Sequence, residues 1–98
     1  MIINHCIIVK WNRDEYVVSD LQEIKRIFDN VKSIAGVYDI SYHENVIARD
    51  NRFDLMIKIK MEESSLLTYD QSIYHKEWKE KYSKYILKKA IFDYEEEK

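Results

Sequence analysis

The segment LLTYDQSIYH, from Leu66 to His75, holds a tyrosine and a histidine six residues apart, Tyr69 and His75. A histidine exchanges a proton near neutral pH, and a tyrosine hydroxyl can orient or polarise a carbonyl or enolate oxygen. On an unbroken helix, six steps of about 100° place these two side chains about 120° apart. They can therefore share a site only if the helix breaks between them, and otherwise their rings fill a core.

Composition bounds the possible functions. The chain has 98 residues, which fit one domain spanning residues 1–98. Sixteen Lys and Arg against 18 Asp and Glu give a net charge of −2, so no positive field attracts nucleic acid or anionic membranes. No apolar run approaches the roughly 20 residues that cross a bilayer. A single cysteine and an opening segment unlike a secretory signal predict a cytoplasmic protein.

Hydrophobic periodicity predicts four strands and two helical regions. The predicted strands are residues 2–11, 37–44, 53–61 and 88–95, and the helical regions are residues 21–34 and a stretch starting at Ser64. Ser19 and Gln22 fit a capping box before the first helix, and Gly36 fits a left-handed cap after it. The segment FDLMIKIKM alternates strictly between apolar and other residues, as a strand with one buried face does.

The order β-α-β-β-α-β is that of the ferredoxin-like α+β fold, with a four-stranded antiparallel sheet and both helices on one face. This arrangement leaves the second face of the sheet bare. Cys6, Ile8, Met56 and the apolar residues that the other strands direct to this face are expected to form an exposed patch, and a second copy of the chain would cover it. The sequence therefore predicts a homodimer joined through the sheets.

Five blocks in this order resemble the stress-responsive α/β-barrel family, called Dabb, of the dimeric α+β barrels. The blocks are INHCIIVKW, IAGVYDISYHENV, RFDLMIKIKME, LTYDQSIYHKEW and IFDYE. The family's fourth block usually reads Tyr, two residues, His-Pro, one residue, His. Tyr69 and His75 match its first and last positions, while Ser72 and Ile73 replace the His-Pro. His43 stands where relatives often have Gly, and Leu55 where some catalytic members have His.

The resemblance implies a pocket between sheet and helices with His5, Tyr69 and His75 as candidate catalytic residues. Ile7, Leu55, Trp78 and Tyr82 are expected to line it. The implied function is binding of a small hydrophobic or carbonyl-containing molecule. The alternatives are a cofactor-independent cyclase or lyase, in which His75 is the base, and a cofactor-free monooxygenase. No cofactor is expected. The histidines could instead be hydrogen-bonded core residues, and Trp78, Tyr82 and Tyr85 could be ordinary core aromatics.

Other motifs indicate no further site. HEN at His43 begins like a zinc-binding helix, but Ile47 stands where the second His is required, so no metal is expected. Cys6 fits a small buried apolar residue. Arg52 and Asp54 are expected to be solvent-exposed or to form an ion pair at the dimer interface. The lysines near residue 80 lie four residues after glutamates, which is typical of a solvated helix face rather than a nucleic-acid interface.

Overall fold

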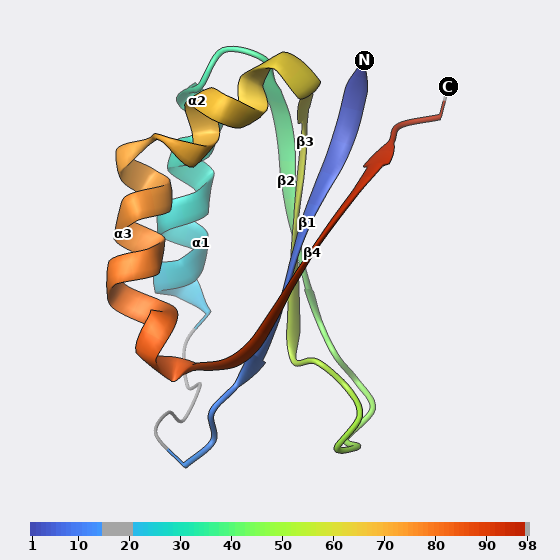
Figure 1. Ribbon diagram of the computed structural model, residues 1–98, viewed down its shortest axis with the longest axis vertical. Coiled ribbons are helices and arrows are strands. Elements are labelled where there is room, and N and C mark those ends of the chain that lie inside the picture. Colours follow the sequence, from blue (N-terminus) through green and yellow to red (C-terminus); the bar gives the residue numbers. More distant parts are fainter. Residues whose placement is uncertain (15–20, 98) are drawn as a thin grey trace.

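The computed structural model describes residues 1–14 and 21–97. Its elements are β1 (Ile2–Trp11), α1 (Gln22–Asp29), η1 (Asn30–Ser33), β2 (Val37–Glu44), β3 (Leu55–Glu62), η2 (Glu63–Ser65), α2 (Leu66–Asp70), α3 (Ile73–Tyr82), η3 (Ser83–Tyr85) and β4 (Ile86–Glu95). The four strands form one sheet in the order β2-β3-β1-β4, and every neighbouring pair is antiparallel. All helices lie on one side of this sheet (Figure 1). The predicted ferredoxin-like α+β fold is confirmed.

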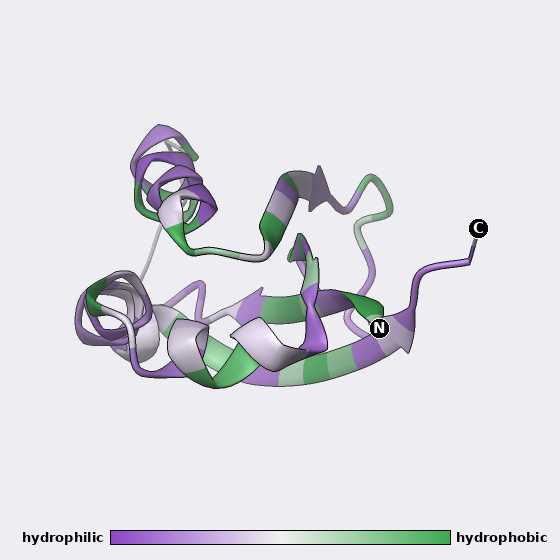
Figure 2. Cartoon of the chain, turned by 90° about the horizontal axis from the view of Figure 1, so that it is seen from above, coloured by the Kyte–Doolittle hydropathy of each residue, from purple (hydrophilic) through white to green (hydrophobic). Residues whose placement is uncertain are grey.

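The core lies between the sheet and α1, where an alternating strand faces an amphipathic helix. The facing buried residues are Leu55, Ile57, Ile59 and Met61 on β3 and Ile24, Ile27 and Phe28 on α1, each at most 3% exposed. Burying a side chain of this size contributes about 1.5–3 kcal/mol. Figure 2 shows the same pattern as alternating apolar and polar bands along the strands. None of the helices described is long and apolar enough to cross a membrane.

The connection from the first helical region to β2 depends on Gly36. Its φ is +89°, a conformation that side chains disfavour, and a Cβ there would lie 2.1 Å from Ser65 Oγ. That hydroxyl donates a 2.7 Å hydrogen bond to the carbonyl oxygen of Ala35. The predicted left-handed turn at Gly36 is therefore confirmed. The predicted capping residue Ser19 lies outside the described residues.

Several boundaries differ from the sequence prediction. The α-helix ends at Asp29, and the chain continues as the 3₁₀ segment η1. β3 begins at Leu55 rather than residue 53 because the side chain of Asp54 turns back to accept a 2.8 Å hydrogen bond from the backbone N–H of Trp11. β4 begins at Ile86, two residues earlier than expected.

The open face of the sheet carries an apolar surface, as predicted, and Ile8 and Met56 are partly exposed there, but Cys6 is not. Cys6 lies on the central strand β1 between Lys58 and Phe92, whose long side chains cover it, so it is only 3% exposed. The expectation that Cys6 belongs to an exposed patch was wrong. Phe92 and Tyr94 on the edge strand β4 are instead 60% and 40% exposed.

Candidate functional site

The helix that follows β3 breaks between Tyr69 and His75, and Ser72 makes the break. Ser72 has extended backbone, with φ −73° and ψ 156°, between the end of α2 and the start of α3. Its hydroxyl donates a 2.7 Å hydrogen bond to the carbonyl oxygen of Tyr69 and accepts one of 3.2 Å from the backbone N–H of His75. A helix-capping serine thus ends α2 and starts α3 in a chain that has no proline.

The break brings the three candidate residues together. The ring centroids of Tyr69 and His75 are 5.1 Å apart, and those of Tyr69 and His5 are 5.6 Å apart, both edge to face. All three side chains border one cavity of about 280 Å³ between α2, α3 and the strands β1 and β4. Its other lining residues are Ile7, Leu66, Asp70, Lys89, Ile91 and Asp93.

Tyr69 borders this cavity, and its buried hydroxyl has an unmet hydrogen bond. Tyr69 is 1% exposed, and within residues 1–14 and 21–97 its hydroxyl has no hydrogen-bond partner. Burial, with a smaller contribution from the charge of Asp70, raises the pKa of Tyr69. The hydroxyl therefore keeps its proton near neutral pH and is available as a donor.

His75 is partly buried, and this burial lowers its pKa below the ordinary value of 6.5. The charge of Asp70 and a hydrogen bond with the backbone of Asp70 act in the opposite direction, and Lys79 and Lys89 reinforce the lowering. The net direction is downward, so His75 is a neutral imidazole at pH 7 and one ring nitrogen can accept a proton.

His5 is held by a carboxylate that the sequence analysis missed. Its Nδ1 lies 2.5 Å from Oδ1 of Asp93, and its side chain is only 7% exposed. With neutral His5, Nδ1–H donates to Asp93 and Nε2 keeps its lone pair. The alternation of Lys89, Ile91 and Asp93 along β4 was a signal that these residues share a face. Which strand they would meet depends on the sheet order.

Three of the expected lining residues do not border this cavity. Ile7 does, but Leu55, Trp78 and Tyr82 do not, which corrects the expectation from the sequence. Leu55 pairs with Val9, four residues along β3 from the partner of His5, and is therefore too distant along the strand.

Trp78 and Tyr82 belong to an aromatic cluster in the core. Their rings are stacked with centroids 5.1 Å apart, and Trp78 also meets the ring of Phe28 at 5.0 Å. Trp78 is 2% exposed and Tyr82 is 6% exposed, which is the alternative that the sequence left open. No group of three potential metal ligands occurs among the described His, Cys, Asp and Glu residues.

Comparison with known proteins gives likeness in structure alone. No family model matches the sequence, and no curated protein matches it. A dimeric ferredoxin-like protein of unknown function from Thermobifida fusca superposes with a TM-score of 0.80 at 11% identity, covering 96% of this chain and 90% of that one. A hydroxynitrile lyase from Passiflora edulis superposes with a TM-score of 0.74 at 13% identity, covering 95% and 91%.

A third solved structure bears on the resemblance found in the sequence. A Dabb family protein with a ferredoxin-like fold from Mesorhizobium loti superposes with a TM-score of 0.67 at 14% identity, covering 99% of this chain and 98% of that one. Its similarity extends over the whole β-α-β-β-α-β arrangement. The predicted resemblance is thus confirmed at the level of the fold, and the chain has the ferredoxin-like fold that this Dabb family protein also has.

Proposed function

We propose that the chain binds a small carbonyl-containing molecule in the cavity bordered by His5, Tyr69 and His75. The observation that carries this proposal is the buried Tyr69 hydroxyl without a partner among the described residues. A buried donor left unpaired costs about 1–3 kcal/mol, and a ligand oxygen in the cavity would recover that energy. A carbonyl oxygen is the simplest such acceptor because it carries no donor of its own.

The walls of the cavity favour a ligand with an apolar body. Ile7, Leu66 and Ile91 line it, while the charged Asp70 and Lys89 also border it. Apolar residues that contact the body of a ligand, together with polar groups that orient it, are the usual combination in a small-molecule site. The proposed ligand therefore combines a hydrophobic group with a carbonyl oxygen.

A cofactor-independent lyase or cyclase is the second candidate, and the state of His75 favours it. A neutral His75 can take a proton from the carbon next to a bound carbonyl, and the resulting enolate oxygen would accept a hydrogen bond from Tyr69. The likeness to the hydroxynitrile lyase from Passiflora edulis supports a lyase as one form of this chemistry. His5, held by Asp93, would be a second proton carrier in the same cavity.

We also propose that two copies pair through their open sheet faces. The exposed Phe92 and Tyr94 lie on that face, and no helix covers it in Figure 1. The similar proteins from Thermobifida fusca and Bacteroides fragilis are described as dimeric. Pairing the two faces would remove these aromatic rings from water.

The binding proposal is tested by NMR with a panel of small aromatic ketones and aldehydes. Binding should shift the amide signals of Tyr69, His75 and their neighbours, and Tyr69→Phe should weaken it about fivefold or more because one hydrogen bond is lost. Tyr42→Phe is the matched control. Its hydroxyl bonds Asp29 and lies outside this cavity, so ligand binding should not change. Equal affinities for the parent and Tyr69→Phe would reject the role of Tyr69.

Measurements of substrate turnover distinguish an enzyme from a protein that only binds the molecule. Loss of substrate that depends on His75, followed by NMR under anaerobic conditions, would establish the lyase or cyclase. Consumption of dissolved oxygen would indicate the monooxygenase instead. Binding without either reaction would leave the chain as a binding protein.

A further inference from the structure

A second and larger cleft lies at the opposite end of the sheet from the two chain termini. The turn after β1 and the long connection between β2 and β3 lie at this end (Figure 1). Their side chains line a cleft of about 610 Å³. The polar lining includes four cations and three carboxylates, namely Lys10, Arg13, Arg49, Arg52, Asp14, Asp50 and Asp54. Neither the candidate histidines nor Tyr69 borders it, so this cleft is separate from the cavity described above.

Two of the four cations already have partners within the protein. Arg13 forms an ion pair with Asp54, which is the partner that the sequence analysis did not foresee for this aspartate. Lys10 donates a hydrogen bond to the backbone carbonyl of Asp50. The two remaining cations, Arg49 and Arg52, take no part in these contacts.

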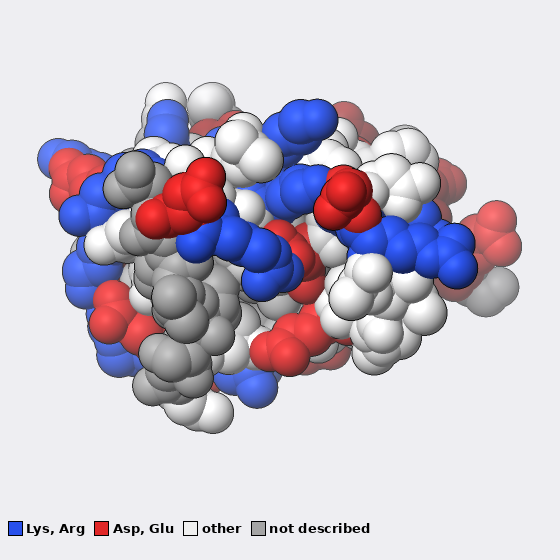
Figure 3. Space-filling view, turned by 90° about the horizontal axis from the view of Figure 1, so that it is seen from below, with Lys and Arg blue, Asp and Glu red and all other residues white. Residues whose placement is uncertain are grey.

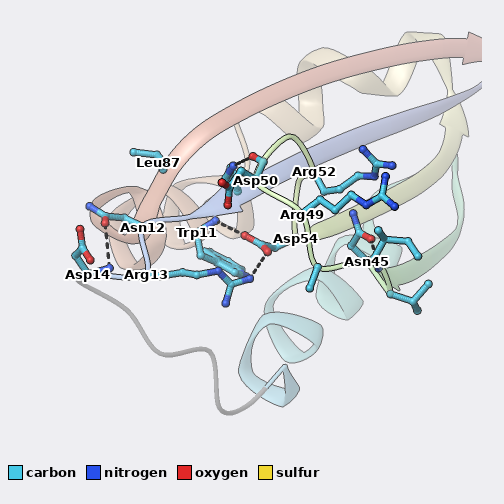
Figure 4. A pocket seen from close by; sticks show the side chains of 14 residues that line it. Trp11, Asn12, Arg13, Asp14, Asn45, Arg49, Asp50, Arg52, Asp54 and Leu87 are labelled. Atoms are coloured by element: carbon cyan, nitrogen blue, oxygen red, sulfur yellow. Dashed lines mark hydrogen bonds and ion pairs between the residues drawn. The ribbon is translucent and has the colours of Figure 1, made fainter.

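Arg49 and Arg52 lack a carboxylate partner among the described residues. Arg52 donates only to the neutral side-chain oxygen of Asn51, at 2.7 Å, and no contact of the Arg49 guanidinium is found within that part of the chain. Their backbones are joined by a 3.1 Å hydrogen bond across one turn. Figure 4 shows both side chains extending in the same direction, away from Asp50 and Asp54. Two like charges on one turn repel each other, and an anion between them would relieve that repulsion.

The connection that carries these arginines is ordered by its own hydrogen bonds. Asn45 donates from its side chain to the carbonyl of Phe53 at 2.7 Å and accepts from the backbone of Ile47 at 2.7 Å. Its backbone N–H donates to the carbonyl of Asp54 at 2.9 Å. A turn held in this way loses little conformational entropy when a ligand binds.

The same cleft is also lined by apolar side chains exposed to solvent. Val46 is 89% exposed and Ile47 is 47% exposed, directly before the turn of Arg49. Figure 3 views this end of the molecule and shows acidic and basic side chains interspersed, so no positive field suited to nucleic acid covers it. A guanidinium pair beside apolar surface is suited to an amphiphilic anion.

We propose that this cleft binds the phosphate or carboxylate group of an amphiphile between Arg49 and Arg52, with its apolar part against Val46 and Ile47. Guanidinium groups recognise planar carboxylates and phosphates through paired, charge-assisted hydrogen bonds. The proposal goes beyond the carbonyl-binding cavity and stands or falls independently of it.

Phenyl phosphate is the probe, with inorganic phosphate and benzyl alcohol as its charged and apolar halves. Titration followed by NMR should shift the amide signals of residues 45–54 and leave those of His75 unchanged. Phenyl phosphate should bind at least several-fold more tightly than either half, and added salt should weaken it. No shift, equal binding of inorganic phosphate, or shifts confined to the His75 cavity would overturn the proposal.

Two double variants test whether the anion binds between Arg49 and Arg52. Arg49→Gln combined with Arg52→Gln should lower the affinity for phenyl phosphate about tenfold or more. The matched control, Arg26→Gln with Lys76→Gln, removes the same charge from cations paired with Glu77 and Glu80 and should bind normally. If both double variants lost the same affinity for phenyl phosphate, the effect would come from net charge alone, and the proposed site would be rejected.

A vesicle experiment distinguishes a lipid headgroup from a free small molecule as the source of the oxyanion. Vesicles of phosphatidylcholine with phosphatidic acid test a lipid headgroup, and dissolved phenyl phosphate tests a free molecule. If the parent protein sediments with the vesicles and the Arg49 and Arg52 double variant does not, the bound oxyanion is the headgroup of a lipid. If phenyl phosphate instead changed the molecular mass in solution, the cleft would be a contact between copies and the proposal would be wrong.

Discussion

His5 and Asp93 face each other across the pairing of β1 with β4, and their side chains meet with 2.5 Å between Nδ1 and Oδ1. The register of the sheet, rather than any nearness in sequence, creates this pair. An imidazole whose Nδ1–H is fixed by a carboxylate presents Nε2 in a defined tautomer and orientation. Asp93 is therefore a positioning residue for the cavity.

Substituting Asp93 by Asn should release His5 from that tautomer. In the parent protein with a neutral His5 ring, ¹⁵N NMR should show a protonated Nδ1 and an unprotonated Nε2. In Asp93→Asn both tautomers should be populated, while the free energy of unfolding falls by about 1 kcal/mol because Asp93 is half exposed. An unchanged tautomer in the variant would contradict the role given to Asp93.

The break at Ser72 predicts that proline is tolerated at the next residue. Ile73 is the first residue of α3 and 73% exposed, and the extended backbone of Ser72 suits a residue before proline. Ile73→Pro should therefore leave the fold intact and stabilise it by up to about 1 kcal/mol in urea unfolding. Lys76→Pro, in the interior of the same helix, should cost about 3 kcal/mol or more. Equal destabilisation by both substitutions would contradict the capping geometry.

The sequence predicted the convergence of Tyr69 and His75 only through the family resemblance. The residues alone indicated that a break was needed, but Ser72 can cap a helix or lie within one, and tertiary packing decides between these. The bounds of β1 followed from its run of β-branched and aromatic residues, and those of β2 followed from apolar alternation.

Long-range register explains what the sequence could not predict. Asp93 lies 88 residues from His5, and only the position of β4 beside β1 brings them together. The burial of Cys6 likewise depends on its neighbours across the sheet, Lys58 and Phe92. Leu55 was expected to line the cavity but does not. The alternation of a strand shows which face a residue occupies, but it does not show how far along the strand the cavity extends.

The lowered pKa of His75 predicts a pH dependence of stability. Its ordinary value of 6.5 applies to the unfolded chain, and burial holds the folded value lower. Between these two values the unfolded state binds more protons, so the free energy of unfolding should decrease as pH falls below about 6.5. Stability from this group is complete above pH 6.5 and is lost as pH falls to the folded pKa.

Urea unfolding from pH 5 to pH 8 measures this effect. His75→Gln should flatten the dependence between pH 5 and 6.5, since it removes the group that titrates. His43→Gln is the control because His43 is exposed and bonded to Ser41 outside the cavity. A parent and a His75→Gln variant with the same slope would show that burial does not act on His75 as described.

The open sheet face predicts a dimer that a single charge can break. Light scattering at micromolar concentration should give about twice the chain mass of 12.0 kDa for the parent protein. Phe92→Lys should shift the mass to that of one chain because it places a cation in the apolar contact between the sheets. The fold of each chain should survive, since Phe92 is 60% exposed in the single chain.

Ile73→Lys is the matched control for that experiment. It places the same charge at an exposed apolar residue on α3, on the helical side of the molecule, and should leave the dimer intact. A parent protein of one chain mass would reject the pairing of the sheets. A dimer that resists Phe92→Lys but dissociates with Ile73→Lys would instead place the contact on the helices. The sheet is favoured over that surface because Phe92 and Tyr94 lie on its uncovered face and lose contact with water only when another layer packs against it.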